Sequence, residues 1–132
     1  MPTPSQDRPL LAPIVNAETE PFWRAAADGI LLLKRAKASG VVHWYPRALC
    51  PYTLQETEWF AASGKGTIYS VSVTRRAGPV PYAIGYVELD EGVTVLSNFV
   101  DCDLDTLRIG DRVKVCFKPT DGGHKIPMFT PA

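Results

Sequence analysis

A two-residue alternation between Thr67 and Thr74 is the feature that most constrains the fold of this chain. One face of the segment carries Tyr69, Val71 and Val73, while the other carries mainly hydroxyl side chains. Because successive side chains of a β-strand point to opposite sides of the sheet, this pattern predicts a strand with two chemically different faces. The segment therefore favours a β-rich fold.

Other segments of the same half of the chain have strand-like patterns. They are Leu54–Phe60, Tyr82–Leu89, Val93–Val100 and Arg112–Lys118, with a short edge strand expected near Ile126–Phe129. Asp90-Glu91-Gly92 predicts a hairpin turn between the second and third of these segments. About five short strands joined by glycine and proline turns are typical of a small barrel.

The first part of the chain has a different character. Residues 1–18 contain four prolines and almost no periodicity, which predicts an extended or disordered arm. Thr19 is expected to cap a short helix that Gly29 ends, and Phe22 and Trp23 give this helix two large aromatic side chains. Two apolar runs follow as candidate strands: Ile30–Leu33 and Val41–Tyr45.

Charge and cysteine content restrict the possible functions. The chain has 14 basic and 14 acidic residues, so its net charge is zero and general binding to nucleic acid phosphates is unfavourable. No apolar window reaches the roughly 20 residues of a membrane span, and the first 15 residues do not resemble a signal peptide. Three widely separated cysteines suit a reducing compartment, so we expect a cytoplasmic protein.

No segment completes a catalytic or ligand-binding motif. Cys50 and His43 could form a nucleophile and base, but no third, orienting group is evident. Gly64-Lys65-Gly66-Thr67 lacks the first glycine of a phosphate loop and the hydroxyl residue directly after its lysine. The alternating aspartates of residues 101–105 lack the later glycine and glutamate of a calcium loop, and we interpret them as a solvated connection.

Several short motifs occur in an order that resembles the DUF35 family. They are Pro21-Phe22-Trp23, Pro46-Arg47, Cys50-Pro51, Trp59, Ser63-Gly64-Lys65-Gly66, Val87-Glu88-Leu89-Asp90-Glu91-Gly92 and Ile109-Gly110-Asp111-Arg112-Val113. The resemblance implies a rubredoxin-like zinc ribbon followed by an OB-fold. We therefore expect a mainly β chain with an arm (1–18), a short helix plus a degenerate zinc-ribbon hairpin (19–53), and a five-stranded OB-fold barrel (54–132).

The chain departs from the family at the metal. The positions that match the family's four ligands are Ala36, Ser39, Cys50 and Thr53, with two, ten and two residues between them. A structural zinc site needs four thiolate or imidazole ligands, and only Cys50 can supply a thiolate. His43 could add a second donor, which is still too few. We predict that the chain binds no zinc.

Apolar packing is then expected to hold the hairpin in place of the metal. Burial of a large side chain contributes roughly 1.5–3 kcal/mol, so four or five such residues could compensate. The candidates are Leu31, Leu32, Leu33, Val41, Val42, Trp44, Tyr45, Leu49 and Tyr52.

The resemblance implies a function as an accessory subunit and not as an enzyme. Proteins similar to this one accompany enzymes of the thiolase superfamily, such as thiolases and acyl-CoA aldolases, and share coenzyme A or acyl-CoA with them. Arg75 and Arg76 are the candidate contacts for coenzyme A phosphates or for an acidic partner. A nucleic-acid-binding OB-fold module, with Tyr69, Tyr82 and Tyr86 stacking on bases, is the alternative. A hydrolase that works alone is a third, weaker alternative.

Overall fold

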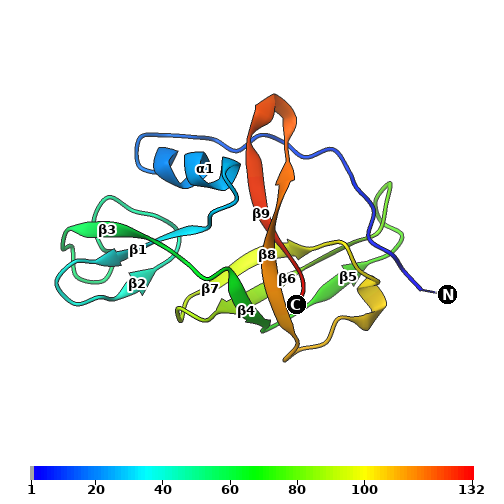
Figure 1. The fold of residues 1–132 in the computed structure, drawn as a ribbon. Coiled ribbons are helices and arrows are strands. Elements are labelled where there is room, and N and C mark those ends of the chain that lie inside the picture. Colours follow the sequence, from blue (N-terminus) through cyan, green and yellow to red (C-terminus); the bar gives the residue numbers. More distant parts are fainter. Residues whose placement is uncertain (1) are drawn as a thin grey trace.

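The computed structural model describes residues 2–132, which form two β-sheets placed side by side and one α-helix (Figure 1). Helix α1 comprises Glu20–Ala27. The small sheet contains β1 (Leu32–Ala36), β2 (Val42–His43) and β3 (Thr57–Ala61). The large sheet contains β4 (Lys65–Ile68), β5 (Ser72–Thr74), β6 (Tyr82–Leu89), β7 (Thr94–Phe99), β8 (Arg112–Pro119) and β9 (Lys125–Pro131). Two short 3₁₀ helices, η1 (Leu104–Thr106) and η2 (Asp121–Gly123), lie in the connections.

The large sheet closes on itself. Strand β4 pairs with both β8 and β6, and the other pairings run from β8 through β9 and β7 back to β6. The shortest pairing of the ring is between β7 and β9, which run parallel and pair at Phe99 and Phe129. This closed, five-stranded order confirms the mainly β, OB-fold-like architecture. Strand β9 lies between β8 and β7, so the expectation of an edge strand near Ile126–Phe129 was wrong.

The alternating segment is not one continuous strand. Ile68 pairs with Val87 and Ser72 pairs with Ile84, so three residues lie opposite two in the interval between them. The amides of Tyr69 and Ser70 both donate to the carbonyl oxygen of Tyr86, at 2.8 and 3.3 Å. This arrangement is a β-bulge, which bends the strand into β4 and β5 and allows the ring to close. The bulge shifts the side-chain alternation by one residue, so Ile68 before it and Val71 and Val73 after it all pack toward the core, whereas the uniform sequence pattern places Ile68 on the opposite face.

Gly85 allows the close approach at the bulge. A Cβ atom at this position would lie 1.9 Å from the carbonyl oxygen of Ser70 and 2.9 Å from the Phe99 ring. Both distances are shorter than a normal contact, so the close approach of the bulge to β6 requires a residue without a side chain.

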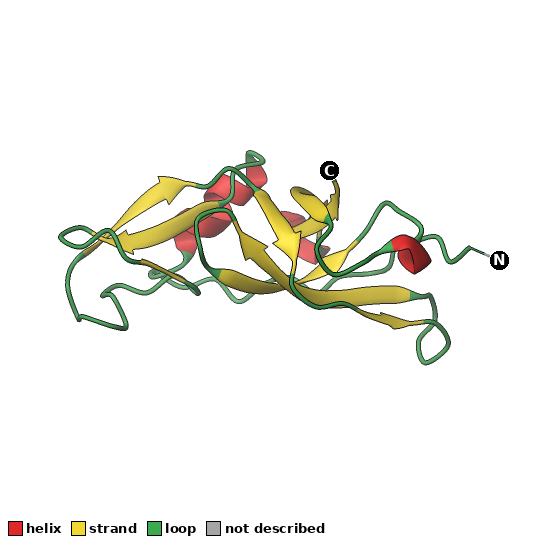
Figure 2. Cartoon of the chain, turned by 90° about the horizontal axis from the view of Figure 1, so that it is seen from below, coloured by secondary structure: helices red, strands yellow, loops and turns green. Residues whose placement is uncertain are grey.

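The small sheet is built around β1. Strand β1 pairs with β2 on one side and along its whole length with β3 on the other, from Leu32–Ala61 to Ala36–Thr57. We expected the helix-and-hairpin region to end at residue 53. Strand β3 comes after that residue but pairs with β1, so by strand pairing this region extends to Ala61. Figure 2 shows the small sheet at one end of an elongated molecule and the barrel strands beside it.

Helix α1 covers the small sheet with an aromatic cluster. Phe22 is buried, and its ring centroid lies 4.8 Å from that of Trp23, 5.6 Å from that of Trp44 and 5.9 Å from that of Tyr45. The helix begins differently from our expectation, because Thr19 makes no side-chain capping bond and Asn16 accepts from the Thr19 amide instead. No helix within residues 2–132 is long and apolar enough to cross a membrane.

Burial in the small sheet agrees with only part of the expected set. Leu31 and Leu33 are buried, and three further candidates are partly buried against the core: Leu32, Val42 and Trp44. Val41, Leu49 and Tyr52 were expected to pack but are exposed. The last two lie on the loop around Cys50, where the chain turns back through local backbone hydrogen bonds and needs no apolar cover.

The arm runs in extended form along the barrel, from the N-terminus toward α1 (Figure 1). Pro4 forms an isolated bridge with Asp103, and the Ser5 amide donates to the carbonyl oxygen of Cys102 at 2.8 Å. Further along, the carbonyl oxygen of Leu10 accepts from the amide of Asp121 at 3.1 Å. Backbone bonds to η1 and η2 therefore attach the arm at two separate points.

Candidate functional site

The four positions that match the family's zinc ligands differ in their exposure. Ala36 and Cys50 are fully buried, whereas Ser39 and Thr53 are exposed. A hydrogen bond from the Thr53 hydroxyl and further bonds from the backbone amides of Tyr52 and Thr53 lower the pKa of the Cys50 thiol. Such donors stabilise the thiolate form, whereas burial of the sulfur acts against it.

The donor set at these positions does not fit zinc. Among residues 2–132, no three His, Cys, Asp or Glu side chains are grouped so that they could hold a metal ion. The methyl group of Ala36 cannot coordinate, and the hydroxyls of Ser39 and Thr53 are poor substitutes for thiolates at neutral pH. The lack of zinc in this protein stays a prediction, and no step of its function is assigned to a metal.

A buried lysine and a buried histidine lie close to the former metal-binding loop. Lys34 and His43 are register partners on β1 and β2. The Lys34 ammonium donates to the carbonyl oxygen of Arg47 at 3.1 Å and lies 4.6 Å from the centroid of the Trp59 ring. Burial lowers the pKa of Lys34, because it disfavours the charged form.

His43 has no polar partner for either ring nitrogen within the described part of the chain. Its pKa is lowered by burial first and then by the charges of Lys34 and Arg47. His43 forms no hydrogen bond with Cys50, so the structure does not support a Cys–His nucleophile pair. We interpret the neutral imidazole as a packing group under the sheet.

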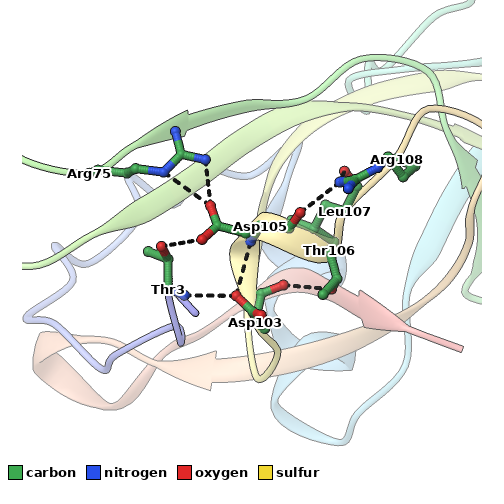
Figure 3. Close-up of polar contacts among 7 residues, drawn as sticks. All are labelled: Thr3, Arg75, Asp103, Asp105, Thr106, Leu107 and Arg108. Atoms are coloured by element: carbon green, nitrogen blue, oxygen red, sulfur yellow. Dashed lines mark hydrogen bonds and ion pairs between the residues drawn. The ribbon is translucent and has the colours of Figure 1, made fainter. Parts of the chain in front are cut away.

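The two candidate arginines have different surroundings, and Figure 3 shows those of Arg75. The Nε atom of Arg75 donates to Asp105 at 3.0 Å, and the other carboxylate oxygen of Asp105 accepts from the hydroxyl of Thr3 at 2.5 Å. Arg75 therefore helps to hold the arm. Arg76 is exposed and forms no ion pair or side-chain hydrogen bond within residues 2–132.

The aspartates of residues 101–105 are structural anchors, contrary to our interpretation of them as a solvated connection. Asp103 accepts from the amides of Thr3 at 2.8 Å and Asp105 at 3.1 Å (Figure 3). The hydroxyl of Thr3, followed by the guanidinium of Arg75, lowers the pKa of the Asp105 carboxyl group. Asp101 binds Lys118 at 2.8 Å. The partners of Asp103 and Asp105 in the arm are about 100 residues away, so no local pattern could reveal this role.

An exposed apolar surface lies on the outside of the barrel. It consists of Tyr69, Ile84, Tyr86 and Leu96, and we call it the β6 face. Tyr86 and Leu96 are register partners, Ile84 lies two residues away on the same side of β6, and the bulge brings the amide of Tyr69 onto the carbonyl oxygen of Tyr86. Exposure reaches 63% for Tyr69 and 57% for Leu96, high values for neighbouring apolar side chains.

The β6 face has little in common with a nucleic-acid groove. The charged residue next to Tyr86 on the same side of β6 is Glu88, and Asp90 follows the strand in an ion pair with Arg112. The third tyrosine of the alternative hypothesis, Tyr82, lies under Arg8, whose guanidinium carbon is 4.4 Å from the ring centroid. Only two of the three tyrosines are therefore open for stacking on bases.

Comparison with known proteins identifies the family. Residues 59–118 match the family described as ChsH2, C-terminal OB-fold domain. A DUF35 domain-containing scaffold protein of Methanothermobacter thermautotrophicus is 38% identical over 109 residues, which cover 76% of this chain and 82% of that protein. A second protein of the same description, from Methanocaldococcus jannaschii, is 33% identical over 104 residues, covering 73% of this chain and 74% of the relative. The chain belongs to the DUF35 family.

Two further similarities extend the DUF35 assignment. A probable enoyl-CoA hydratase alpha subunit of Thermomonospora curvata is 29% identical to this DUF35 chain over 126 residues. The aligned residues cover 91% of this chain but only 39% of that subunit. The solved structure named Ltp2-ChsH2(DUF35) aldolase superposes with a TM-score of 0.79 and 27% identity, covering 91% of this chain and 98% of the matched one. The structural match thus includes the small sheet as well as the barrel.

Proposed function

We propose that this DUF35 chain is a non-catalytic accessory subunit that binds an enzyme of the thiolase superfamily and acts with it on acyl-CoA. The observation that carries the proposal is the match to the DUF35 chain of the Ltp2-ChsH2 aldolase, which spans 91% of this chain. Two relatives named scaffold proteins support the accessory role, and the relative named as an enoyl-CoA hydratase subunit supports the acyl-CoA context.

The internal chemistry of the chain supports a role in binding. Cys50 and His43 are both buried and are not hydrogen-bonded to each other, and Lys34 is bound to a backbone carbonyl. In this proposal the nucleophile and the base belong to the partner. Three free cysteines suit the reducing cytoplasm, where we place the complex.

The β6 face is our proposed docking surface for the partner enzyme. Three of its four side chains lie on the paired strands β6 and β7, and the Tyr69 amide in the bulge is hydrogen-bonded to β6, so docking on them would need little ordering of the backbone. Aromatic residues at the centre of a surface patch are typical anchors of protein interfaces. The acidic neighbour Glu88 further favours a protein over nucleic acid as the occupant.

Arg76 is the proposed contact for the phosphates of coenzyme A. Its guanidinium group has no carboxylate partner in residues 2–132, so it can bind a phosphate without first breaking an ion pair. Arg75 would have to release Asp105 and loosen the arm before it could bind the same group. We therefore assign the phosphate contact to Arg76 and the anchoring of the arm to Arg75.

Co-purification of a tagged chain from its native host, with mass spectrometry of the captured proteins, tests this function. We expect a thiolase-superfamily subunit to be enriched with the unchanged chain and lost with Tyr86→Glu or Leu96→Glu. Ile109→Glu is the control, because Ile109 is an even more exposed apolar residue but lies outside the β6 face. Capture of no such subunit, or capture that the two face variants leave unchanged, would contradict the proposal.

An activity assay tests the division of labour. The purified chain should not turn over acyl-CoA thioesters, and adding it to the captured enzyme should raise that enzyme's activity. Arg76→Gln should raise the KM for acyl-CoA in the complex without weakening assembly. Turnover by the isolated chain would show that it is an enzyme, and salt-sensitive retention of single-stranded nucleic acid in a filter-binding assay would favour the alternative function.

A further inference from the structure

A second candidate site lies between the arm and the barrel. The structure contains a cavity of about 230 Å³ there, with arm residues Ser5–Arg8 and Leu10 on one side and the ends of β6, β7 and β8 on the other. We call it the arm cleft. None of its lining residues belongs to the β6 face, so an inference about the cleft does not depend on the proposed function.

The interior of the arm cleft is mainly apolar. Phe99 and Met128 are buried core residues that contribute to its surface, and Val100, Pro81 and Leu10 extend the apolar lining. Small apolar cavities of about 150 Å³ can hold a benzene molecule. A cavity half as large again suits an apolar body of roughly eight to ten non-hydrogen atoms.

The charges around the cleft leave one cation without an acidic partner. Lys118 binds both carboxylate oxygens of Asp101 at 2.8 Å, and this hydrogen bond raises the pKa of Lys118. The negative charge of Asp7 also acts on Lys118. Arg8 lies over the Tyr82 ring at 4.4 Å and forms no ion pair within residues 2–132. Its planar guanidinium group thus borders an apolar cavity with its donors free for an anion.

We propose that the arm cleft binds a small organic carboxylate, with its apolar body in the cavity and its carboxylate on Arg8. A guanidinium group binds a carboxylate through two parallel hydrogen bonds, which fixes the orientation of the ligand. Stacking on Tyr82 holds the guanidinium plane in place before the ligand arrives. The ligand would contact both the arm and the barrel, so binding would also strengthen the docking of the arm.

Titration of the full chain with sodium octanoate, followed by isothermal calorimetry and by amide NMR shifts, tests the proposal. Octanoate has the required length and charge, and 1-octanol is the uncharged control of nearly equal size. We expect saturable binding of one octanoate per chain, with shifts at the amides of Ser5, Arg8 and Val100. Binding of 1-octanol should be about tenfold weaker or more, because it cannot form the charge-assisted bonds.

Variants separate the arm cleft from other apolar surfaces. Arg8→Gln should weaken octanoate binding about tenfold or more, Arg8→Lys should keep part of the affinity, and Arg24→Gln should leave it unchanged. Arg24 is the matched control because it is an exposed arginine on α1, outside the cleft. The shift of the Ser5 amide in each free variant shows whether the arm is still docked.

Three results would overturn the proposal. They are the absence of saturable octanoate binding, equal affinity for octanoate and 1-octanol, and full affinity in a correctly docked Arg8→Gln variant. Shifts confined to the amides around Tyr86 and Leu96 would place the ligand on the β6 face and would also contradict it.

Discussion

Every strand of the barrel ring has two paired neighbours, whereas the small sheet, as described by residues 2–132, ends in two edges, β2 and β3. The barrel interior is a continuous set of apolar side chains contributed by all of its ring strands. Phe22, Leu31 and Leu33 of the small-sheet region continue the same apolar core, and the small sheet also contains two buried ionisable groups, Lys34 and His43. The two regions therefore share an apolar core but differ in strand closure and in their buried ionisable groups.

This difference concerns how the small sheet is held if, as we predict, the chain binds no zinc. Closure of a barrel satisfies strand edges without external support. A three-stranded sheet has too small an interior for that, so in this chain α1 provides an aromatic cover from outside. Backbone hydrogen bonds hold the Cys50 turn: the Cys50 amide donates to the carbonyl oxygen of Gln55, and the Leu54 amide donates to that of Cys50.

Completing a set of four thiolates around Cys50 should have the largest effect on the stability of the small sheet relative to that of the barrel. The combined variant Ala36→Cys, Ser39→Cys, Thr53→Cys is expected to bind one zinc ion and to raise the stability of the small sheet by several kcal/mol. Zinc binding contributes about 10–16 kcal/mol in zinc-finger peptides, and part of this is offset by adjustment of the buried Ala36 position. Elemental analysis and thermal unfolding with and without a chelator measure the effect.

The control adds Cys50→Ser to the same variant, which removes the one native thiolate and should abolish stoichiometric binding. The unchanged chain should contain no zinc. One equivalent of zinc in the unchanged chain would mean that the apolar cover does not replace the metal.

Truncation of one aromatic side chain in each region should show whether the barrel and the small sheet unfold separately. Phe99→Ala removes a core side chain of the barrel and should lower the global free energy of unfolding by about 3–5 kcal/mol. Phe22→Ala should act mainly on the small sheet, so amide exchange should accelerate at Leu33 and Phe60 and much less in β6. Equal acceleration in both regions would show that the two regions unfold as one unit.

Protonation of His43 should destabilise the small sheet by a smaller amount. The folded-state pKa is lowered, so the unfolded chain binds more protons below the ordinary histidine pKa. Stability should therefore fall as pH decreases from 7 to 5, by up to about 1.4 kcal/mol per pH unit. Denaturant unfolding at several pH values measures this slope.

His43→Leu should remove this part of the pH dependence, and His124→Leu is the matched control. His43→Leu should also be more stable than the unchanged chain at pH 7 by about 1 kcal/mol, because it removes two buried nitrogens without partners. Retention of the full slope in His43→Leu would exclude His43 as its source.

Loss of the Asp105 carboxylate should have the smallest effect and should be confined to the arm. The pKa of this carboxyl group is lowered in the docked state, so its contribution is present above the ordinary aspartate range and is lost as pH falls through it. Asp105→Asn should reduce amide protection at Ser5 and Leu104 while barrel protection stays unchanged. Glu88→Gln, at an exposed carboxylate without an ion pair in residues 2–132, should leave the arm unchanged. Unaltered protection in Asp105→Asn would contradict the anchoring role.

The sequence predicted the regions that local periodicity determines. The hairpin of Tyr82–Leu89 and its partner strand, and the strand at Arg112–Lys118, agree with β6, β7 and β8 to within one or two residues. In these segments side-chain alternation and turn residues favour the same structure, so neighbouring residues alone are informative. The family motifs likewise predicted the OB-fold-like barrel.

Features that depend on distant contacts could not be predicted. The anchoring of Thr3 by Asp103 and Asp105, and the pairing of Arg75 with Asp105, join segments that are far apart in the chain. The two candidate arginines therefore looked equivalent in the sequence but differ in the structure. Exposure of Tyr52 was missed for a related reason, because an apolar residue beside a turn gives no sign of which side it faces.

Gly85 lies in the interior of the barrel but affects the position of a residue on its outer surface. Gly85 admits the carbonyl group of Ser70, and the same bend presents the neighbouring Tyr69 on the outer surface. Even one added methyl group would push the bulge outward and carry Tyr69 away from Tyr86. If the β6 face docks the partner as we propose, a substitution at the buried Gly85 would weaken assembly without touching the partner, and co-purification of Gly85→Ala with the partner enzyme would measure this.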